Sequence, residues 1–403
     1  MEHGYTFFGI RKSSKMDAKN YWVLVALDEA GKVVWYKDTG HTIGDVKCLK
    51  NGSIMYLTFD HRAIEMDMLG NVLNQWTAIA RWPGLHAAED DIVPVAAEAF
   101  QHEIFEMESG NFLVLSVEAR EFPDYPTEVA DPTAPRKTAT VVGDVVVEFT
   151  RTGEVVIQWR LLDILDPYRV GYDSLSSYLE TKGIPNSQDW SHANSVVHAP
   201  SDDTLIVSLR HQDALIKFKR ATCELVWIIG PHEAWKEPWS QYLLSPGAGL
   251  DSQYHQHNAN LSERNTVLVF DNGNNRAWLP EQKLAAADNY SRVVEYELSE
   301  DGSAVEQVWS YGGPGAEAHY CPFISGAYQL PETGNVLATF GGRLTDEHGL
   351  PSDKPSEDLG SIRIAEVTHD EEPEKVFELF IDETAVGWGW DVYRSDRFTS
   401  LYG

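Results

Sequence analysis

Apolar residues along this chain recur in short alternating runs, and most of these runs end in tryptophan. An alternating apolar strand is followed by a polar turn and a second, β-branched strand, which is the signature of a β-hairpin. The pattern occupies residues 25–35, 63–76, 145–159, 214–227 and 293–309, each closing on a tryptophan, and returns in residues 364–377, which close on Phe377.

A second pattern precedes most of these hairpins and supplies two more short strands. It begins at His102, His192 and His257, with weaker copies beginning at Gly44 and Ser325. The full unit therefore has four short strands, and we count six units. Repeated four-stranded units are typical of a β-propeller. We predict an all-β, six-bladed β-propeller, with an irregular β-sandwich array as the alternative.

The spacing of the units indicates where the chain carries insertions. We expect one propeller domain over residues 1–403, with insertions on one face, around the channel mouth. The predicted insertions are residues 77–100, 122–136, 161–191, with helical character at 172–181, and 231–256. Residues 387–394 either complete a blade or pack at the channel. A blade that joins both chain ends would remove an exposed sheet edge.

Charge and composition exclude several classes of partner. The formal net charge is −30, which argues against nucleic acid and anionic membranes as partners. The sequence contains no run of 18 apolar residues, so it predicts no transmembrane helix. The three cysteines predict no disulfide framework. The polar segment 1–20 predicts a cytoplasmic protein, or a secreted or periplasmic one whose signal peptide has been removed. The oligomeric state stays open, a homodimer being one option.

The candidate chemistry lies where three consecutive units begin. His102, His192 and His257 occupy equivalent positions, so repeat equivalence places their imidazoles around one end of the central channel. The remaining histidines lack this support. His41 and His255 are near unit starts and stay ambiguous, and the ones interpreted as ordinary residues are His198, His211, His319, His348 and His369.

Two polar residues extend this group. Asn194 lies two residues after His192, which puts both side chains on one face of an extended strand. Arg210 ends the strand before the next turn and could return to the same rim. A guanidinium beside neutral imidazoles and a carboxamide suits a bound oxyanion such as sulfate, phosphate or carboxylate. An arginine would disfavour a metal ion at this place.

Two other functions remain open on the residues alone. Three histidines with Gln101 or Gln256 could ligate a divalent transition metal, as in a propeller lyase or hydrolase. The aromatic insertions could instead serve a non-catalytic propeller that binds a sugar or a protein.

The motifs around these residues resemble those of the arylsulfate sulfotransferase family. They are QHEI at 101–104, DWSHANSV at 189–196, SLR at 208–210, QHNA at 256–259, FDNG at 270–273 and SGAYQLPETGNVL at 325–337. The resemblance implies a six-bladed propeller that moves a sulfuryl group from an aryl sulfate to a phenol. It implies no cofactor and no metal, with these two small molecules as the partners.

The resemblance also assigns roles to the candidate residues. It implies that His257 is a nucleophile that forms a transient sulfohistidine, so that the kinetics are ping-pong. His102, His192, Asn194 and Arg210 would then hold the sulfuryl oxygens and stabilise their charge. The extra N-terminal β-domain and the cysteine pair of the family's periplasmic members are not visible in this sequence, and the acceptor stays open.

Overall fold

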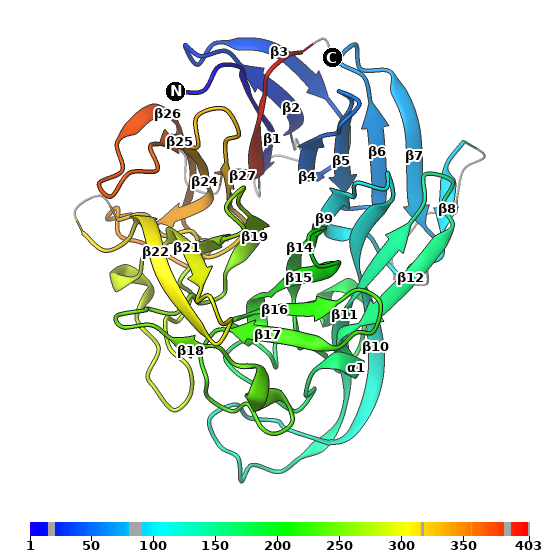
Figure 1. The fold of residues 1–403 in the computed structure, drawn as a ribbon, viewed down its shortest axis with the longest axis vertical. Helices are drawn as coiled ribbons and strands as arrows, with labels where there is room; N and C mark the ends of the chain where they lie inside the picture. Colours follow the sequence, from blue (N-terminus) through cyan, green and yellow to red (C-terminus); the bar gives the residue numbers. More distant parts are fainter. Residues whose placement is uncertain (15–20, 80–90, 316–317, 356, 383–387, 402–403) are drawn as a thin grey trace.

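The chain forms a ring of small antiparallel sheets around a central axis (Figure 1). The computed structural model describes residues 1–14, 21–79, 91–315, 318–355, 357–382 and 388–401. Almost all regular structure in these ranges is β-strand, and each sheet runs from the axis to the periphery. The predicted all-β propeller is therefore confirmed.

Three groups of strands lie mainly in the first half of the chain. The first consists of the C-terminal strand β27 (Trp388–Phe398) with β1 (Tyr5–Ser14), β2 (Tyr21–Leu27) and β3 (Val33–Asp38). The second consists of β4 (Ile43–Cys48), β5 (Ile54–Thr58), β6 (Arg62–Met66) and β7 (Val72–Ala78), with β8 (Val93–Val95) on its edge. The third consists of β9 (Gln101–Glu106), β10 (Phe112–Tyr125), β11 (Lys137–Phe149) and β12 (Val155–Arg160), with β13 (Ser187–Asp189) paired to β11.

Three further groups complete the ring. The fourth consists of β14 (Ala193–Ala199), β15 (Thr204–Leu209), β16 (Ala214–Lys219) and β17 (Leu225–Ile229). The fifth consists of β19 (His257–Leu261), β20 (Val267–Asp271), β21 (Arg292–Leu298) and β22 (Ala304–Gly312), with β18 (Ser245–Pro246) on its edge. The last consists of β23 (Gly326–Gln329), β24 (Val336–Thr345), β25 (Leu359–Val367) and β26 (Lys375–Ile381).

The two chain ends meet in one sheet, which is one of the two arrangements that the sequence left open for residues 387–394; residue 387 lies outside the described residues. Strand β27 lies antiparallel to β1, with Tyr5 opposite Phe398. A single parallel pair, Gly360 with Gly389, also joins β27 to β25, so the first and last groups share one eight-stranded sheet. The hydrogen-bonded sheets of the described residues therefore number five. Dividing the shared sheet at that pair gives six groups, and the blade number of six stays a prediction.

The innermost strands of neighbouring groups contact one another in a closed cycle, β27–β4–β9–β14–β19–β23–β27. Because these strands are not paired in a ladder, side chains on one strand accept hydrogen bonds from backbone N–H groups of the next. The acceptors are Asp45 for Ile104, Glu103 for Val196, Asn194 for Asn258, and Asn258 for Ala327. Buried polar groups thus tie the sheets together at the axis.

The repeated tryptophans connect the sheets at the periphery. Each of four indole N–H groups donates to a backbone carbonyl in the third-to-fourth strand turn of the next group, over 2.8–3.0 Å. The pairs are Trp35 with Met68, Trp76 with Arg151, Trp159 with Arg220, and Trp309 with Asp370. Trp227 makes no such bond in the described part of the chain. A cavity of about 240 Å³, lined by Trp227, Lys217 and Arg264 among others, lies at its seam.

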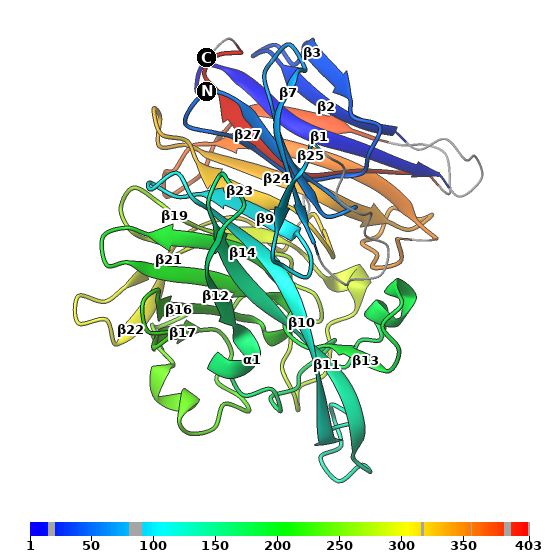
Figure 2. The ribbon, with the colours of Figure 1, turned by 90° about the vertical axis from the view of Figure 1, so that its right-hand side faces the viewer.

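The insertions differ in character. Residues 122–136 form the distal part of the β10–β11 hairpin, which projects beyond the ring (Figure 2). The insertion 161–191 holds α1 (Leu161–Ile164) and the 3₁₀ helix η1 (Tyr178–Lys182), so the helical segment begins later than predicted. Residues 80–90 of the insertion 77–100 lie outside the described residues. That the insertions gather on one face, within a single domain, stays a prediction.

The other 3₁₀ helices are single short turns. They are η2 (Arg210–Gln212), η3 (Trp239–Tyr242) and η4 (Ala286–Asp288). None of the helices in the described ranges has the length and apolar character that a membrane crossing requires.

Candidate active site

The three repeat-equivalent histidines lie at the starts of consecutive inner strands. His102 is the second residue of β9, His192 immediately precedes β14, and His257 is the first residue of β19. The ring centroids of His102 and His192 are 5.0 Å apart. Burial lowers the pKa of His257 well below its usual value, and the neighbouring Arg210, His102 and His192 lower it further. The structure therefore brings four predicted site residues together, and their chemical roles stay predictions.

Backbone irregularities aim these side chains at the site. The strand register shifts directly after each histidine, between Gln101 and Ile104, between Ala193 and Ser195, and between His257 and Asn260. Such β-bulges redirect side chains and occur often beside active sites. His102 and His192 also have positive φ angles, 57° and 48°. Non-glycine residues pay for this conformation with strain, which clusters at functional sites.

A buried carboxylate on β11 holds two of these irregular segments in place. Asp144 accepts hydrogen bonds from Gln101 Nε2 at 2.7 Å, from Ser191 Oγ at 2.6 Å and from the backbone N–H of Ala193 at 2.6 Å. These donors flank His102 and His192. Burial raises the pKa of Asp144 to about 7, although the two donors from the β14 side oppose the shift. Asp144 thereby sets the spacing of the two imidazoles.

Asn272 decides which nitrogen of His257 carries the proton. Its Nδ2 donates to the carbonyl oxygens of Cys321 and Ile324, at 2.7 and 3.0 Å. Its Oδ1 must therefore be the atom that faces His257 Nδ1, at 2.8 Å. An amide oxygen only accepts, so Nδ1 of His257 bears the hydrogen and Nε2 bears the lone pair. Nε2 has no hydrogen-bond partner among the described residues.

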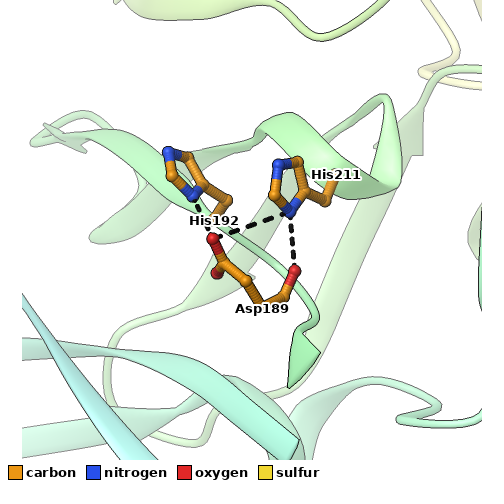
Figure 3. A group of neighbouring side chains, drawn as sticks. All are labelled: Asp189, His192 and His211. Carbon is orange, nitrogen blue, oxygen red and sulfur yellow. Dashed lines mark hydrogen bonds and ion pairs between the residues drawn. The ribbon is translucent and has the colours of Figure 1, made fainter. Parts of the chain in front are cut away.

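The other two histidines have different partners at Nδ1. His102 Nδ1 lies 2.8 Å from the hydroxyl of Tyr393 on β27. Burial lowers the pKa of His102 well below its usual value, and His192 and Arg394 add to the effect. His192 Nδ1 lies 2.6 Å from Oδ2 of Asp189 (Figure 3). The two imidazoles thus face different groups at Nδ1, a hydroxyl for His102 and a carboxylate for His192.

Arg210 reaches the site through a second histidine. It begins η2, and its Nη1 lies 2.7 Å from Nε2 of His211. Nδ1 of His211 lies 2.6 Å from the backbone oxygen of Asp189, so Asp189 contacts both His192 and His211 (Figure 3). The sequence interpretation of His211 as an ordinary residue missed this contact, although its position directly after Arg210 was an available signal.

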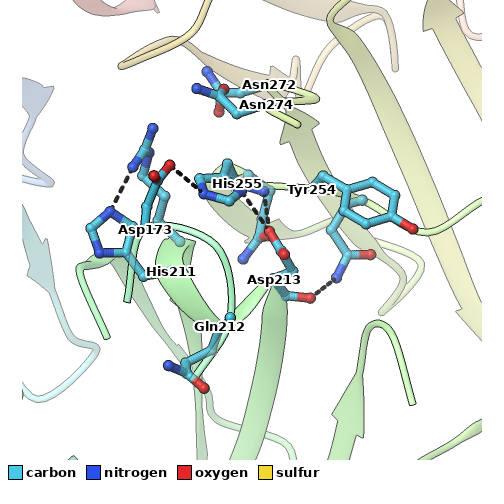
Figure 4. A network of polar contacts seen from close by, with 12 residues as sticks. Asp173, His211, Gln212, Asp213, Tyr254, His255, Asn272 and Asn274 are labelled. Carbon is cyan, nitrogen blue, oxygen red and sulfur yellow. Dashed lines mark hydrogen bonds and ion pairs between the residues drawn. The ribbon is translucent and has the colours of Figure 1, made fainter. Parts of the chain in front are cut away.

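His255 lies farther along the same row of rings, 5.9 Å from His211. Its two nitrogens face two carboxylates, Asp173 at 3.0 Å and Asp213 at 2.8 Å (Figure 4). Burial opposes protonation, but Asp213 and Asp173 outweigh it and raise the pKa of His255. His255 therefore places a buried imidazole, held between two carboxylates, next to Arg210 and His211. The sequence left its role ambiguous.

Asn194 lies between strands. Its side chain is completely buried; Nδ2 donates to the carbonyl of Gln256 at 2.7 Å, and Oδ1 accepts from the N–H of Asn258 at 3.2 Å. The same-face expectation relied on regular strand alternation, which the bulge between Ala193 and Ser195 interrupts. Both polar ends of Asn194 are thus used in joining β14 to β19.

One group of side chains has the composition of a metal site. Asp189, His192 and His211 each offer one ligand atom, all within 4.8 Å of one another. Both imidazoles, however, already direct Nδ1–H groups at Asp189, and the Arg210 guanidinium adjoins His211. A metal would need those nitrogens deprotonated and would be repelled by the adjacent cation. These contacts therefore argue against a metal ion at this cluster.

Comparison with known proteins agrees with this donor set. The family model described as arylsulfotransferase (ASST) matches residues 7–390. The chain belongs to the arylsulfotransferase family. The match begins in β1 and ends in β27, so it encompasses all the candidate site residues.

Two curated relatives are named arylsulfate sulfotransferase AssT. The one from Escherichia coli is 26% identical over an alignment of 371 positions that covers 79% of this chain and 57% of the relative. The one from Lelliottia amnigena is 28% identical over an alignment of 228 positions that covers 46% of this chain and 37% of the relative. The chain thus spans about half the length of the family members it matches, or less.

A solved structure shares the architecture. It is a protein of unknown function from Bacteroides caccae, 11% identical, with a TM-score of 0.50 over 97% of this chain and 99% of that one. At this identity the likeness concerns the fold alone.

Proposed function

We propose that this protein transfers a sulfuryl group from an aryl sulfate to a phenol, with His257 as the covalent carrier. The observation that supports this most is the Asn272–His257 contact, which leaves a neutral imidazole with its Nε2 lone pair available beside Arg210. Family membership and the named relatives supply the substrate class.

The reaction has two balanced halves. Nε2 of His257 attacks sulfur, an N–S bond forms, and the S–O bond to the donor phenol breaks. The phenolate leaves with the bonding electrons and takes a proton. An acceptor phenol then loses a proton, its oxygen attacks the same sulfur, and the N–S bond breaks. A phenol is a good leaving group because its pKa is about 10. No oxidant, reductant or nucleotide is required.

The charge distribution suits this transfer. Negative charge spreads over the three equatorial oxygens of the sulfuryl group in the transition state, by analogy with phosphoryl transfer. Arg210 supplies the positive charge, while His102 supplies a neutral ring beside it. Fixed donors of this kind stabilise a transition state without reorganising.

We assign the proton transfers to His192. The carboxylate of Asp189 at its Nδ1 can stabilise the imidazolium that forms when Nε2 accepts the acceptor phenol's proton. His192 gives a proton from Nε2 to the departing phenolate in the first half-reaction and regains one from the acceptor phenol in the second. Asn194 takes a positioning role, because its side chain fixes β19 just after His257.

The test is a single turnover. Enzyme mixed with an excess of a chromogenic aryl sulfate and no acceptor should release a burst of phenol equal in amount to the active sites. A peptide containing His257 should gain ~80 Da, the mass of one sulfuryl group on a covalent intermediate. Release that stays linear without a burst would contradict the carrier. Turnover that vanishes with chelator and returns with a divalent metal would instead support a metal-dependent enzyme.

A further inference from the structure

Arg210 has a long side chain that starts from a short turn, so its guanidinium needs fixed partners to act at a defined point. Two are present. Nη1 lies 2.7 Å from Nε2 of His211, and Nη2 donates to the carbonyl of Pro322 at 3.2 Å. Binding a group in one geometry removes the entropy cost from the reaction step.

The protonation state of His211 follows from its neighbours. The carbonyl of Asp189 only accepts, so Nδ1 of His211 carries the hydrogen. A guanidinium only donates, so Nε2 of His211 provides the lone pair. Burial lowers the pKa of His211 to about 3, with Arg210 and His192 acting in the same direction against Asp189. His211 is therefore a neutral acceptor at any pH at which the protein would be assayed.

We propose that His211 is a positioning residue: its neutral imidazole holds the Arg210 guanidinium at the sulfuryl site, and the backbone of Asp189 holds His211. This inference rests on the proposed function only for the identity of the bound anion, which is the sulfuryl group. The anion-binding geometry itself requires only the contacts of Arg210. His211 stays behind the guanidinium and does not touch the substrate.

Asp189 contacts His211 through its backbone oxygen and His192 through its carboxylate, so the two contacts can be tested separately. Its backbone oxygen supports His211 and, through it, Arg210. Its carboxylate lies 2.6 Å from Nδ1 of His192 and 3.9 Å from Nδ1 of His211. A side-chain substitution at Asp189 therefore disturbs mainly the histidine assigned to proton transfer and keeps the backbone contact that supports His211. Substitution of His211 disturbs the Arg210 guanidinium and leaves the contact between Asp189 and His192 in place.

Three variants test the proposal. His211→Leu removes the acceptor, His211→Gln restores one because Oε1 of glutamine can occupy the position of Nε2, and His198→Leu is the matched control. His198 lies on β14, where its Nε2 is 2.9 Å from Asp203, away from the site. Melting temperatures identify any variant that fails to fold.

The first readout is binding of inorganic sulfate, measured by calorimetry and by thermal shift. We expect His211→Leu and Arg210→Ala to weaken sulfate binding at least about tenfold, since each removes or releases a charged donor. His211→Gln and His198→Leu should bind within about threefold of the wild type. Equal affinity in the wild type and His211→Leu, or no sulfate binding by the wild type, would overturn the inference.

The second readout is a double-mutant cycle. Arg210→Ala should lower kcat/KM for an aryl sulfate about 100-fold in the wild type but under about tenfold in the His211→Leu background, because the released guanidinium contributes little. Additive losses would count against the coupling. Asp189→Asn should alter the pH profile and leave sulfate affinity unchanged.

These outcomes separate the positioning role from the proposed function. Sulfate binding with the expected order of variants, but without sulfuryl transfer, would uphold the role of His211 and reject the sulfotransferase activity. Sulfuryl transfer with a His211→Leu variant that binds sulfate normally would do the reverse.

Discussion

Residues at equivalent repeat positions make the same contacts at the periphery of this propeller but different contacts at the end of its axis. At the periphery, Trp35, Trp76, Trp159 and Trp309 make the same hydrogen bond to the next sheet. At the axial end, three equivalent histidines have three different Nδ1 partners: a phenol hydroxyl, a carboxylate and an amide oxygen. Equivalent position gives equivalent structure in one region and distinct chemistry in the other.

This contrast explains how a repeat architecture can hold an asymmetric site. The inner-strand positions bring the imidazoles together, and residues outside the repeat pattern then set each tautomer and charge. Asp189 ends β13 in an insertion, and Asn272 directly follows β20. Substitutions at the site and at the periphery test this contrast. Their expected effects range from loss of turnover to small changes in rate.

Replacing His257 should have the largest effect. His257→Ala should lower turnover by ~10³-fold or more, because it removes the nucleophile. Its melting temperature should stay near that of the wild type, since one imidazole at the end of a strand adds little to the sheet cores. Steady-state assay and circular dichroism measure the two quantities. Full activity in His257→Ala would end the case for a covalent carrier.

Replacing the charge-stabilising and proton-transfer residues should cost less. Arg210→Ala and His192→Ala should each lower kcat about 100-fold, the scale of losing one oxyanion donor. His369→Ala is a suitable control, because His369 stacks on Trp309 at the periphery. A loss as large as for His257→Ala would point to a nucleophile other than His257.

The peripheral contacts should affect stability without affecting turnover. Trp159→Phe removes the hydrogen bond to the Arg220 carbonyl and some packing volume, so the free energy of unfolding should fall by about 1–3 kcal/mol. Urea denaturation measures this, with Tyr36→Phe as a control because Tyr36 is 71% exposed. A change in kcat with unchanged stability would contradict the separation of the two regions.

The smallest effect concerns pH. The pKa of His257 is lowered, so the neutral nucleophile persists as pH falls and is lost only well below the usual value of 6.5. The burst rate with a nitrophenyl sulfate, whose leaving group needs no protonation, should change less than about twofold between pH 6 and 8. An unshifted imidazole would lose about fourfold over the same interval. A fourfold loss would show that His257 is not held neutral.

Much of the fold could be predicted because the repeats report it directly. The closing tryptophans mark the fourth strand of a unit, and the histidine-led segments mark the inner strand. The pairing of β27 with β1 is one of two arrangements that the sequence left open, and it covers a sheet edge. The helical segment in 161–191 was placed too early, because insertions lack the periodicity that defines an element.

The sequence could predict mainly those site residues that occupy equivalent positions in the repeats. His102, His192 and His257 were found by position, and Arg210 by its place after a strand. His211, Asp189 and Asn272 act through single contacts from connecting segments, which no periodic pattern marks. Asn194 shows the opposite limit: strand alternation cannot be used where a bulge changes the register.

Strand β27, which pairs with β1 to join the two ends of the ring, carries two of the contacts on which the candidate site depends. Tyr393 holds His102, and the Nη2 of the neighbouring Arg394 donates to the carbonyl of Asn194 at 2.6 Å. Synthesis proceeds from the N-terminus, so nascent chains lacking residues 388–398 would present the histidines without this support. The candidate site would thus be assembled only after residues 388–398 have been synthesised and have paired with β1.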